Sequence, residues 1–133
     1  ILFNIHGPGG ILCTIGGVAC WVVFWLSQRL GFSEILSYFW ASLFASLYSE
    51  IMARIRKYPA ISYLLVSAFP LIPGAGVYYT MNFAVRGEMD MFAYRGMNTA
   101  AIAGIMAVGI LLGSTVFRMY AQWKSHRMQK TKT

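Results

Sequence analysis

Apolar runs separated by short polar connectors organise this chain of 133 residues. A helix needs about 20 apolar residues to cross the hydrocarbon core of a bilayer, and four runs approach or exceed that length. They occupy residues 10–27, 35–53, 61–85 and 98–117, and a basic tail follows at 118–133. The pattern predicts a single transmembrane domain, an all-α integral membrane protein built as a bundle of about four helices. The apolar Ile1–Phe3 is typical of the end of a preceding helix, which leaves open one further helix before residue 1.

The third run contains an interruption, Pro-Leu-Ile-Pro-Gly-Ala-Gly at residues 70–76. Pro70 and Pro73 each remove an amide donor and clash with the preceding turn, and Gly74 and Gly76 permit backbone angles that other residues avoid. In lipid, irregular backbone survives only inside protein or beside a water-filled cavity, and broken helices often mark transporter binding sites. Two interpretations stay open: a kink that shapes helix packing, and a break that forms part of a substrate pathway.

The break would create a candidate site for an anion. A helix restarting after Pro73 begins with free amides that carry about half a positive charge, which suits a carboxylate. Hydroxyl and amide side chains in the following turns could hydrogen-bond a polar solute. The candidates for the substrate pathway are Pro70, Pro73, Gly74, Gly76, Tyr78, Tyr79, Thr80 and Asn82.

Small residues recur at helical spacing in the second and fourth runs. The second run has two adjacent rows, Ala41, Ala45 and Ser49 beside Ser42 and Ser46, and the fourth has a GxxxG match at Gly109 and Gly113. Such stripes let helix backbones approach closely in membranes. They predict tight helix interfaces within or between subunits, including association of copies of the chain, and we do not expect a functional monomer.

One acidic residue lies inside a predicted span. Glu50 precedes Arg54 by four residues, a spacing and order that favour an ion pair on one helix. A carboxylate at this depth is a functional candidate in a membrane protein. Glu50 and Arg54 are therefore candidates for ion coupling, and a local ion pair that anchors the helix end is the alternative.

Composition and charge fit a membrane protein and argue against a nucleic-acid partner. Only 11% of residues are charged, against about 25% in soluble domains. The net charge of +7 gathers in connectors and tail rather than on an aromatic-studded polar face. Positive residues favour the cytoplasmic side of a membrane. The connector 54–57 and the basic tail are therefore expected on the cytoplasmic side of the cell (cytoplasmic) membrane. The connectors 28–34 and 86–96 are expected outside.

Candidate catalytic or metal-binding chemistry is sparse. The chain has four acids and two histidines, with no Ser/His/Asp set, paired carboxylates or metal cluster at plausible depth. Cys13 and Cys20, seven residues apart, match no redox or zinc motif and are expected to be small buried packing residues. His6 is expected at the membrane interface rather than as a proton carrier. We expect neither enzymatic activity nor a cofactor or metal.

Several of these residues resemble a known pattern. They are Phe3-Asn4, Ser49-Glu50, Arg54 ahead of Pro59, and above all Pro70-Leu-Ile-Pro-Gly74 with Gly76, Tyr78 and Thr80. The chain resembles the small-subunit half of the threonine/serine exporter (ThrE-like) family. The resemblance implies secondary export of small polar metabolites such as threonine, serine or short dicarboxylates, together with a larger membrane subunit. A non-transporting assembly subunit is the alternative function.

Overall fold

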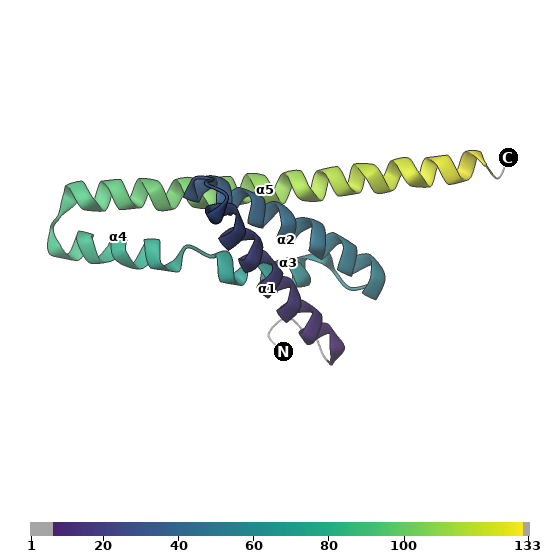
Figure 1. Cartoon of the computed structure of the whole chain (residues 1–133), viewed down its shortest axis with the longest axis horizontal. Coiled ribbons are helices and arrows are strands. Elements are labelled where there is room, and N and C mark those ends of the chain that lie inside the picture. Colours follow the sequence, from purple (N-terminus) through teal and green to yellow (C-terminus); the bar gives the residue numbers. More distant parts are fainter. Residues whose placement is uncertain (1–6, 132–133) are drawn as a thin grey trace.

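The computed structural model describes residues 7–131, and these residues form helices joined by short turns. The all-helical prediction is confirmed for this part of the chain, whereas Asn4 and His6 lie outside the described residues. In chain order the elements are α1 (Pro8–Arg29), α2 (Glu34–Arg56), α3 (Ala60–Ala68), the 3₁₀ helix η1 (Phe69–Leu71), α4 (Gly74–Arg86) and α5 (Met89–Lys130) (Figure 1).

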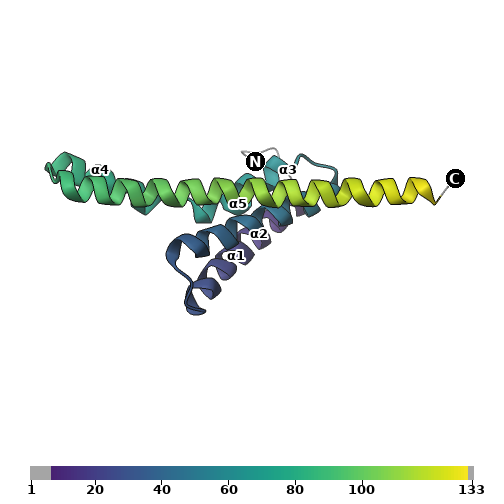
Figure 2. The same cartoon turned by 90° about the horizontal axis from the view of Figure 1, so that it is seen from above.

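The helices are arranged in two parts that share α5. α1, α2 and α3 pack against one another, and α5 packs on α2. Among the described elements α4 contacts α5 alone, and the two form a hairpin that projects from one end of the bundle (Figures 1 and 2). The C-terminal part of α5 projects from the other end. α5 therefore links the bundle to the hairpin.

Local sequence signals explain where the helices begin and end. Ser33 caps α2 by accepting a hydrogen bond from the Leu36 amide at 3.4 Å. Gly31 and Gly87 follow α1 and α4 with φ values of 88° and 74°, a left-handed geometry that glycine adopts without a Cβ penalty. Pro59 precedes α3 and cannot continue α2. Successive long elements consequently alternate in direction along the molecule (Figure 1).

The core is formed by buried side chains of α1, α2, η1 and α5. Its buried apolar side chains are Cys20, Phe24, Ala41, Ala45, Leu71, Ile102 and Met106. Cys13 and Cys20 are buried free thiols, as expected of small packing residues. Serines fill much of the inward face of α2, and Ser37, Ser42, Ser46 and Ser49 are all almost completely buried. Small side chains rather than large apolar ones therefore set the spacing of the bundle.

The predicted tight helix interface forms between α2 and α5 of the same chain. A Cβ atom at Gly113 would lie 2.8 Å from Ser46 Cβ and 3.1 Å from the Leu43 carbonyl oxygen. One at Gly109 would lie 3.0 Å from the Phe39 carbonyl oxygen. Both glycines thus allow the α5 backbone to rest directly on α2.

The predicted interruption of the third run is confirmed. α3 ends at Ala68, η1 contains Pro70, Ile72 is extended ahead of Pro73, and α4 restarts at Gly74 with a bend of 55°. The extended residue follows from the clash that a proline imposes on its predecessor. Gly74 and Gly76 do not adopt the backbone angles that only glycine permits, because the described glycines with positive φ are Gly7, Gly31 and Gly87.

The α5 helix extends beyond the span predicted from polarity at both ends. The connector expected at 86–96 is reduced to a turn at Gly87 and Glu88, and α5 is already helical from Met89. At the other end α5 continues to Lys130 rather than stopping near Phe117, because the tail lacks proline and glycine and is rich in helix-forming residues. Polarity marks where a helix leaves an apolar environment, not where it ends.

Judged by length and composition, two or three segments of the described chain could cross a membrane. α1 and α5 are long and apolar enough to span a bilayer, and the bent pair 60–71 and 74–86 could form a third span. α2 is 23 residues long, but its serines and charged residues make it less apolar. The four predicted spans thus correspond to helices, while the crossing of α2 stays a prediction.

Candidate functional site

A small polar cavity lies between α2, α3 and α5. It has a volume of about 150 Å³, enough for several water molecules. Its lining residues are Ser46, Ser49, Glu50, Ala60, Ile61, Leu64, Ser114 and Arg118. Three hydroxyls, one carboxylate and one guanidinium therefore face a wall of small and aliphatic side chains.

Glu50 forms an ion pair with Arg118 across the α2–α5 interface. Arg118 Nε lies 3.2 Å from Glu50 Oε1, and the carboxylate side chain is 9% exposed while that of Arg118 is 66% exposed. The predicted pairing of Glu50 with Arg54 is wrong. Arg54 instead lies over the Phe117 ring, 4.9 Å from its centroid. Burial of Glu50 against α5 brings it to the guanidinium on that helix rather than to one on its own helix.

The hydroxyls of the cavity are oriented by backbone carbonyls. Ser46 Oγ donates to the Ile110 carbonyl oxygen at 2.9 Å, so at its 2.9 Å contact with Ser114 Oγ it acts as acceptor. Ser49 Oγ donates to the Ala45 carbonyl oxygen at 2.7 Å. Each hydroxyl keeps lone-pair capacity, so the serines can receive hydrogen bonds from a solute in the cavity.

The charged pair can recognise a solute that carries both signs of charge. Arg118 contacts Glu50 through Nε, and its two Nη groups lie on a largely exposed side chain where they can hold a carboxylate in two-point contact. The buried Glu50 can accept from an ammonium group. The cavity is therefore suited to a small zwitterion or to a cation that competes for the carboxylate.

Sequence reasoning identified Glu50 but missed Arg118 and Ser114. The small-residue rows of α2 and α5 contain the information needed to predict them, because these rows set how the two helices align. Ser46 contacts Ser114, and one helical turn further along both parallel helices Glu50 meets Arg118. Pairing the serine row of α2 with the glycine row of α5 would thus have placed the charged residues together.

The predicted pathway residues of the Pro–Gly element lie elsewhere. Pro70 and Gly74 are exposed at the bend, Pro73 and Asn82 are half-buried, and Tyr78 and Tyr79 are exposed and stack edge to face. Thr80 is buried, and its hydroxyl donates to the Gly76 carbonyl oxygen at 2.7 Å. α4 has no contact with α2 among the described residues, and none of the set lines the Glu50 cavity, although Pro70 lies in η1, which contacts α2 and α3.

The two glycines of the element differ in their surroundings. A Cβ at Gly76 would lie 2.5 Å from Thr99 Oγ1 on α5, whereas one at Gly74 would meet nothing within 4 Å. Gly76 is thus explained by close packing. Gly74 begins α4, whose first turn has no side-chain cap. The Gly74 amide donates to the Ile72 carbonyl oxygen at 2.7 Å and the Val77 amide to the Pro73 carbonyl oxygen at 3.2 Å. The predicted half-helix end is therefore left with the amides of Ala75 and Gly76.

Comparison with protein families gives one match, whereas curated proteins and solved structures give none at a significant level. The family model described as "Threonine/Serine exporter, ThrE" matches residues 1–116. The matched range contains Glu50, the serine rows and the whole Pro–Gly element, and it stops two residues before Arg118.

Proposed function

This chain belongs to the threonine/serine exporter family, and we propose that it is one subunit of a secondary transporter that exports small polar metabolites across the cytoplasmic membrane. The proposed cargo is a threonine- or serine-type amino acid, with short dicarboxylates as the second class. The long apolar helices and the family assignment support a membrane transporter.

The observation that carries this proposal is the Glu50–Arg118 pair in a serine-lined cavity. In the proposed binding mode, the Nη groups of Arg118 hold the carboxylate of the cargo, Glu50 accepts from its ammonium group, and Ser114 meets its side-chain hydroxyl. A zwitterion satisfies both charges, whereas the second carboxylate of a dicarboxylate would lie near Glu50 and be repelled. The cavity thus favours amino acids over dicarboxylates.

A larger membrane subunit is part of the proposal. A cavity of about 150 Å³ at the edge of a small bundle encloses little on its own. The hairpin of α4 and α5 presents the exposed aromatic residues Tyr78, Tyr79 and Tyr94 without cover from α1–α3. We propose that the larger subunit, and further copies of this chain, complete the pathway, with the amides at the start of α4 contributing to it.

A non-transporting assembly subunit is the competing function. It is favoured by the packing role of Gly76, and none of the residues 70–76 lines the Glu50 cavity. Under that function the Glu50–Arg118 pair would only hold α2 to α5.

The two functions are separated by efflux of labelled threonine from vesicles that contain this chain with its larger subunit. Glu50→Gln and Arg118→Gln are expected to lower efflux at least tenfold while the complex remains assembled. The matched controls are Glu88→Gln and Arg86→Gln, which remove the same charges at the α4–α5 turn and should leave efflux unchanged.

A charge swap sharpens the test. Glu50→Arg combined with Arg118→Glu restores an ion pair, so a purely structural pair would regain both stability and efflux. If the two groups bind cargo, stability should recover but efflux should not. Full efflux by the swapped variant would refute the binding mode and favour the assembly function.

A further inference from the structure

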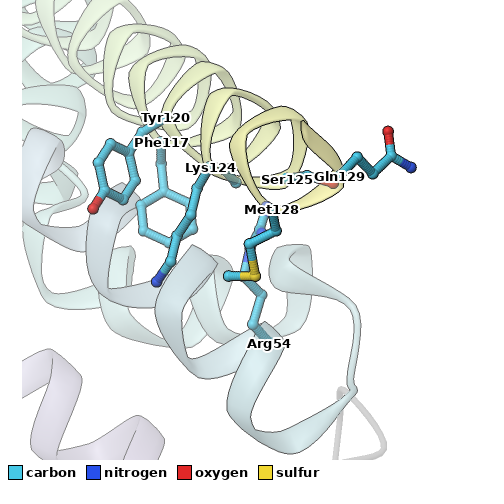
Figure 3. Close-up of a pocket in the computed structure, with 8 residues that line it drawn as sticks. Arg54, Phe117, Tyr120, Lys124, Ser125, Met128 and Gln129 are labelled. Atoms are coloured by element: carbon cyan, nitrogen blue, oxygen red, sulfur yellow. The ribbon is translucent and has the colours of Figure 1, made fainter. Parts of the chain in front are cut away.

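A second and larger groove lies at the end of the molecule opposite to the α4–α5 turn. It has a volume of about 560 Å³ and is formed by the C-terminal end of α2 and the projecting part of α5. Figure 3 shows Lys124 and Met128 extending from α5 toward α2, with Met128 beside Arg54 and Lys124 beside Phe117, whereas Gln129 points away. The groove thus combines two cations with an apolar wall.

This end of the molecule carries more cations than acids. The chain has four acids, of which Glu34 begins α2 and Glu88 and Asp90 lie at the α4–α5 turn. The fourth, Glu50, is already paired with Arg118. The cations of this end are Arg54, Arg56, Lys57, Lys124, Arg127 and Lys130. An anionic occupant is therefore favoured over a neutral or cationic one.

The position of the groove corresponds to the boundary of the bilayer. α5 has 42 residues, about 63 Å at 1.5 Å per residue, so it exceeds the ~30 Å hydrocarbon core and must leave it. The groove begins at Phe117, where the apolar run of α5 ends. Tyr120 and Trp123 are each about 60% exposed there, as expected of side chains at head-group level.

From these observations we propose that the groove binds an anionic phospholipid. Arg54 and Lys124 hold the phosphate of the head group, and Phe117 and Met128 pack against the start of the acyl chains. The Arg54 guanidinium is held in place by its contact with the Phe117 ring at 4.9 Å. A soluble anion would use the two cations but would leave the apolar wall in contact with water, and for this reason we assign the site to a lipid.

The test is lipid binding to the full chain in mild detergent, measured by native mass spectrometry. Phosphatidylglycerol should bind more tightly than phosphatidylcholine with the same acyl chains. Because each cation near a lipid surface contributes about 1 kcal/mol, Arg54→Gln with Lys124→Gln should weaken phosphatidylglycerol binding about 30-fold. The matched control Arg86→Gln with Arg95→Gln removes the same charge from the α4–α5 hairpin, at the other end of the molecule, and should retain binding.

Two further variants keep the proposal testable. Lys124→Gln alone lies on the projecting, exposed part of α5, so it should fold even if the double variant does not, and it should lose about fivefold in affinity. Met128→Gln should weaken binding while leaving the charge intact. Unchanged affinity in the folded cation variants, or equal losses in the control pair, would overturn the site. Displacement of the lipid by millimolar inorganic phosphate would show a soluble-anion site instead and would equally refute the assignment.

Discussion

α5 makes two helix interfaces of opposite character. Against α2 it presents glycines to serines, and this close approach buries Glu50 beside the guanidinium of Arg118. Against α4 it presents Thr99 and Gly96 to Gly76 and Thr80, and the outer faces of both helices remain exposed and aromatic. The first interface contains charged and polar groups that can bind a solute. The second is a packing contact, and the aromatic side chains of its two helices lie on their exposed outer faces.

Close packing and solute-binding groups occur together at only one of these two interfaces. Small side chains on α2 leave room for a cavity lined by hydroxyls, because serines occupy little volume while adding hydrogen-bonding oxygen atoms. On α4 the one buried hydroxyl, that of Thr80, is used by its own helix. The variants below test whether this distinction holds.

The largest effect is expected from Gly113→Leu. Its Cβ alone would lie 2.8 Å from Ser46 Cβ, so a leucine must push α2 and α5 apart and disrupt the Ser46–Ser114 contact. Overpacking of this kind costs roughly 1–3 kcal/mol of stability. The midpoint of thermal unfolding in detergent should fall markedly. Gly104→Leu is the matched control, since a Cβ at Gly104 meets nothing within 4 Å; equal stability losses in both would contradict the proposed α2–α5 interface.

Gly76→Val should give the next largest effect, confined to the hairpin. The new Cβ would lie 2.5 Å from Thr99 Oγ1, so α4 must shift from α5 at a cost of about 1 kcal/mol or more. Protease protection of the α4–α5 turn should decrease while the bundle unfolds as before. Combining it with Thr99→Ala removes the nearest atoms and should restore protection. Failure of that rescue would mean that the glycine serves another purpose.

The sequence was informative about backbone features and less so about side-chain partners. Proline and glycine act locally, so the break at 70–74 and the Gly109–Gly113 interface could be predicted from the chain alone. The partner of Glu50 could not be read from the nearest cation, because Arg118 is 68 residues away and reaches Glu50 only once α2 and α5 are parallel. The Pro–Gly block predicted a site at the start of α4, whereas the polar cavity is lined by serines of α2 and α5 that match no motif.

A smaller effect is expected from Ser114→Ala. The change removes the hydroxyl that donates to Ser46 Oγ, while Ser46 keeps its bond to the Ile110 carbonyl oxygen. The loss of one such hydrogen bond should lower the stability by about 0.5–1.5 kcal/mol. Thr115→Ala, on the exposed neighbouring position, should change the unfolding midpoint less. In efflux assays Ser114→Ala should weaken binding of threonine more than binding of alanine, because only threonine has a side-chain hydroxyl for Ser114 to meet.

The smallest structural effect is expected from Gly74→Ala, and this variant tests the hairpin as part of the pathway. Its φ lies outside the left-handed region and a Cβ there meets nothing within 4 Å, so packing does not oppose the change. Stability should stay within about 0.5 kcal/mol of the parent, since alanine also loses less backbone entropy than glycine on folding. If the amides of Ala75 and Gly76 hold the carboxylate of the cargo, the methyl group added beside them should nevertheless raise the apparent KM for efflux. Unchanged KM in Gly74→Ala, beside a strong effect of Arg118→Gln, would assign carboxylate recognition to the bundle alone and leave the broken helix as a packing feature.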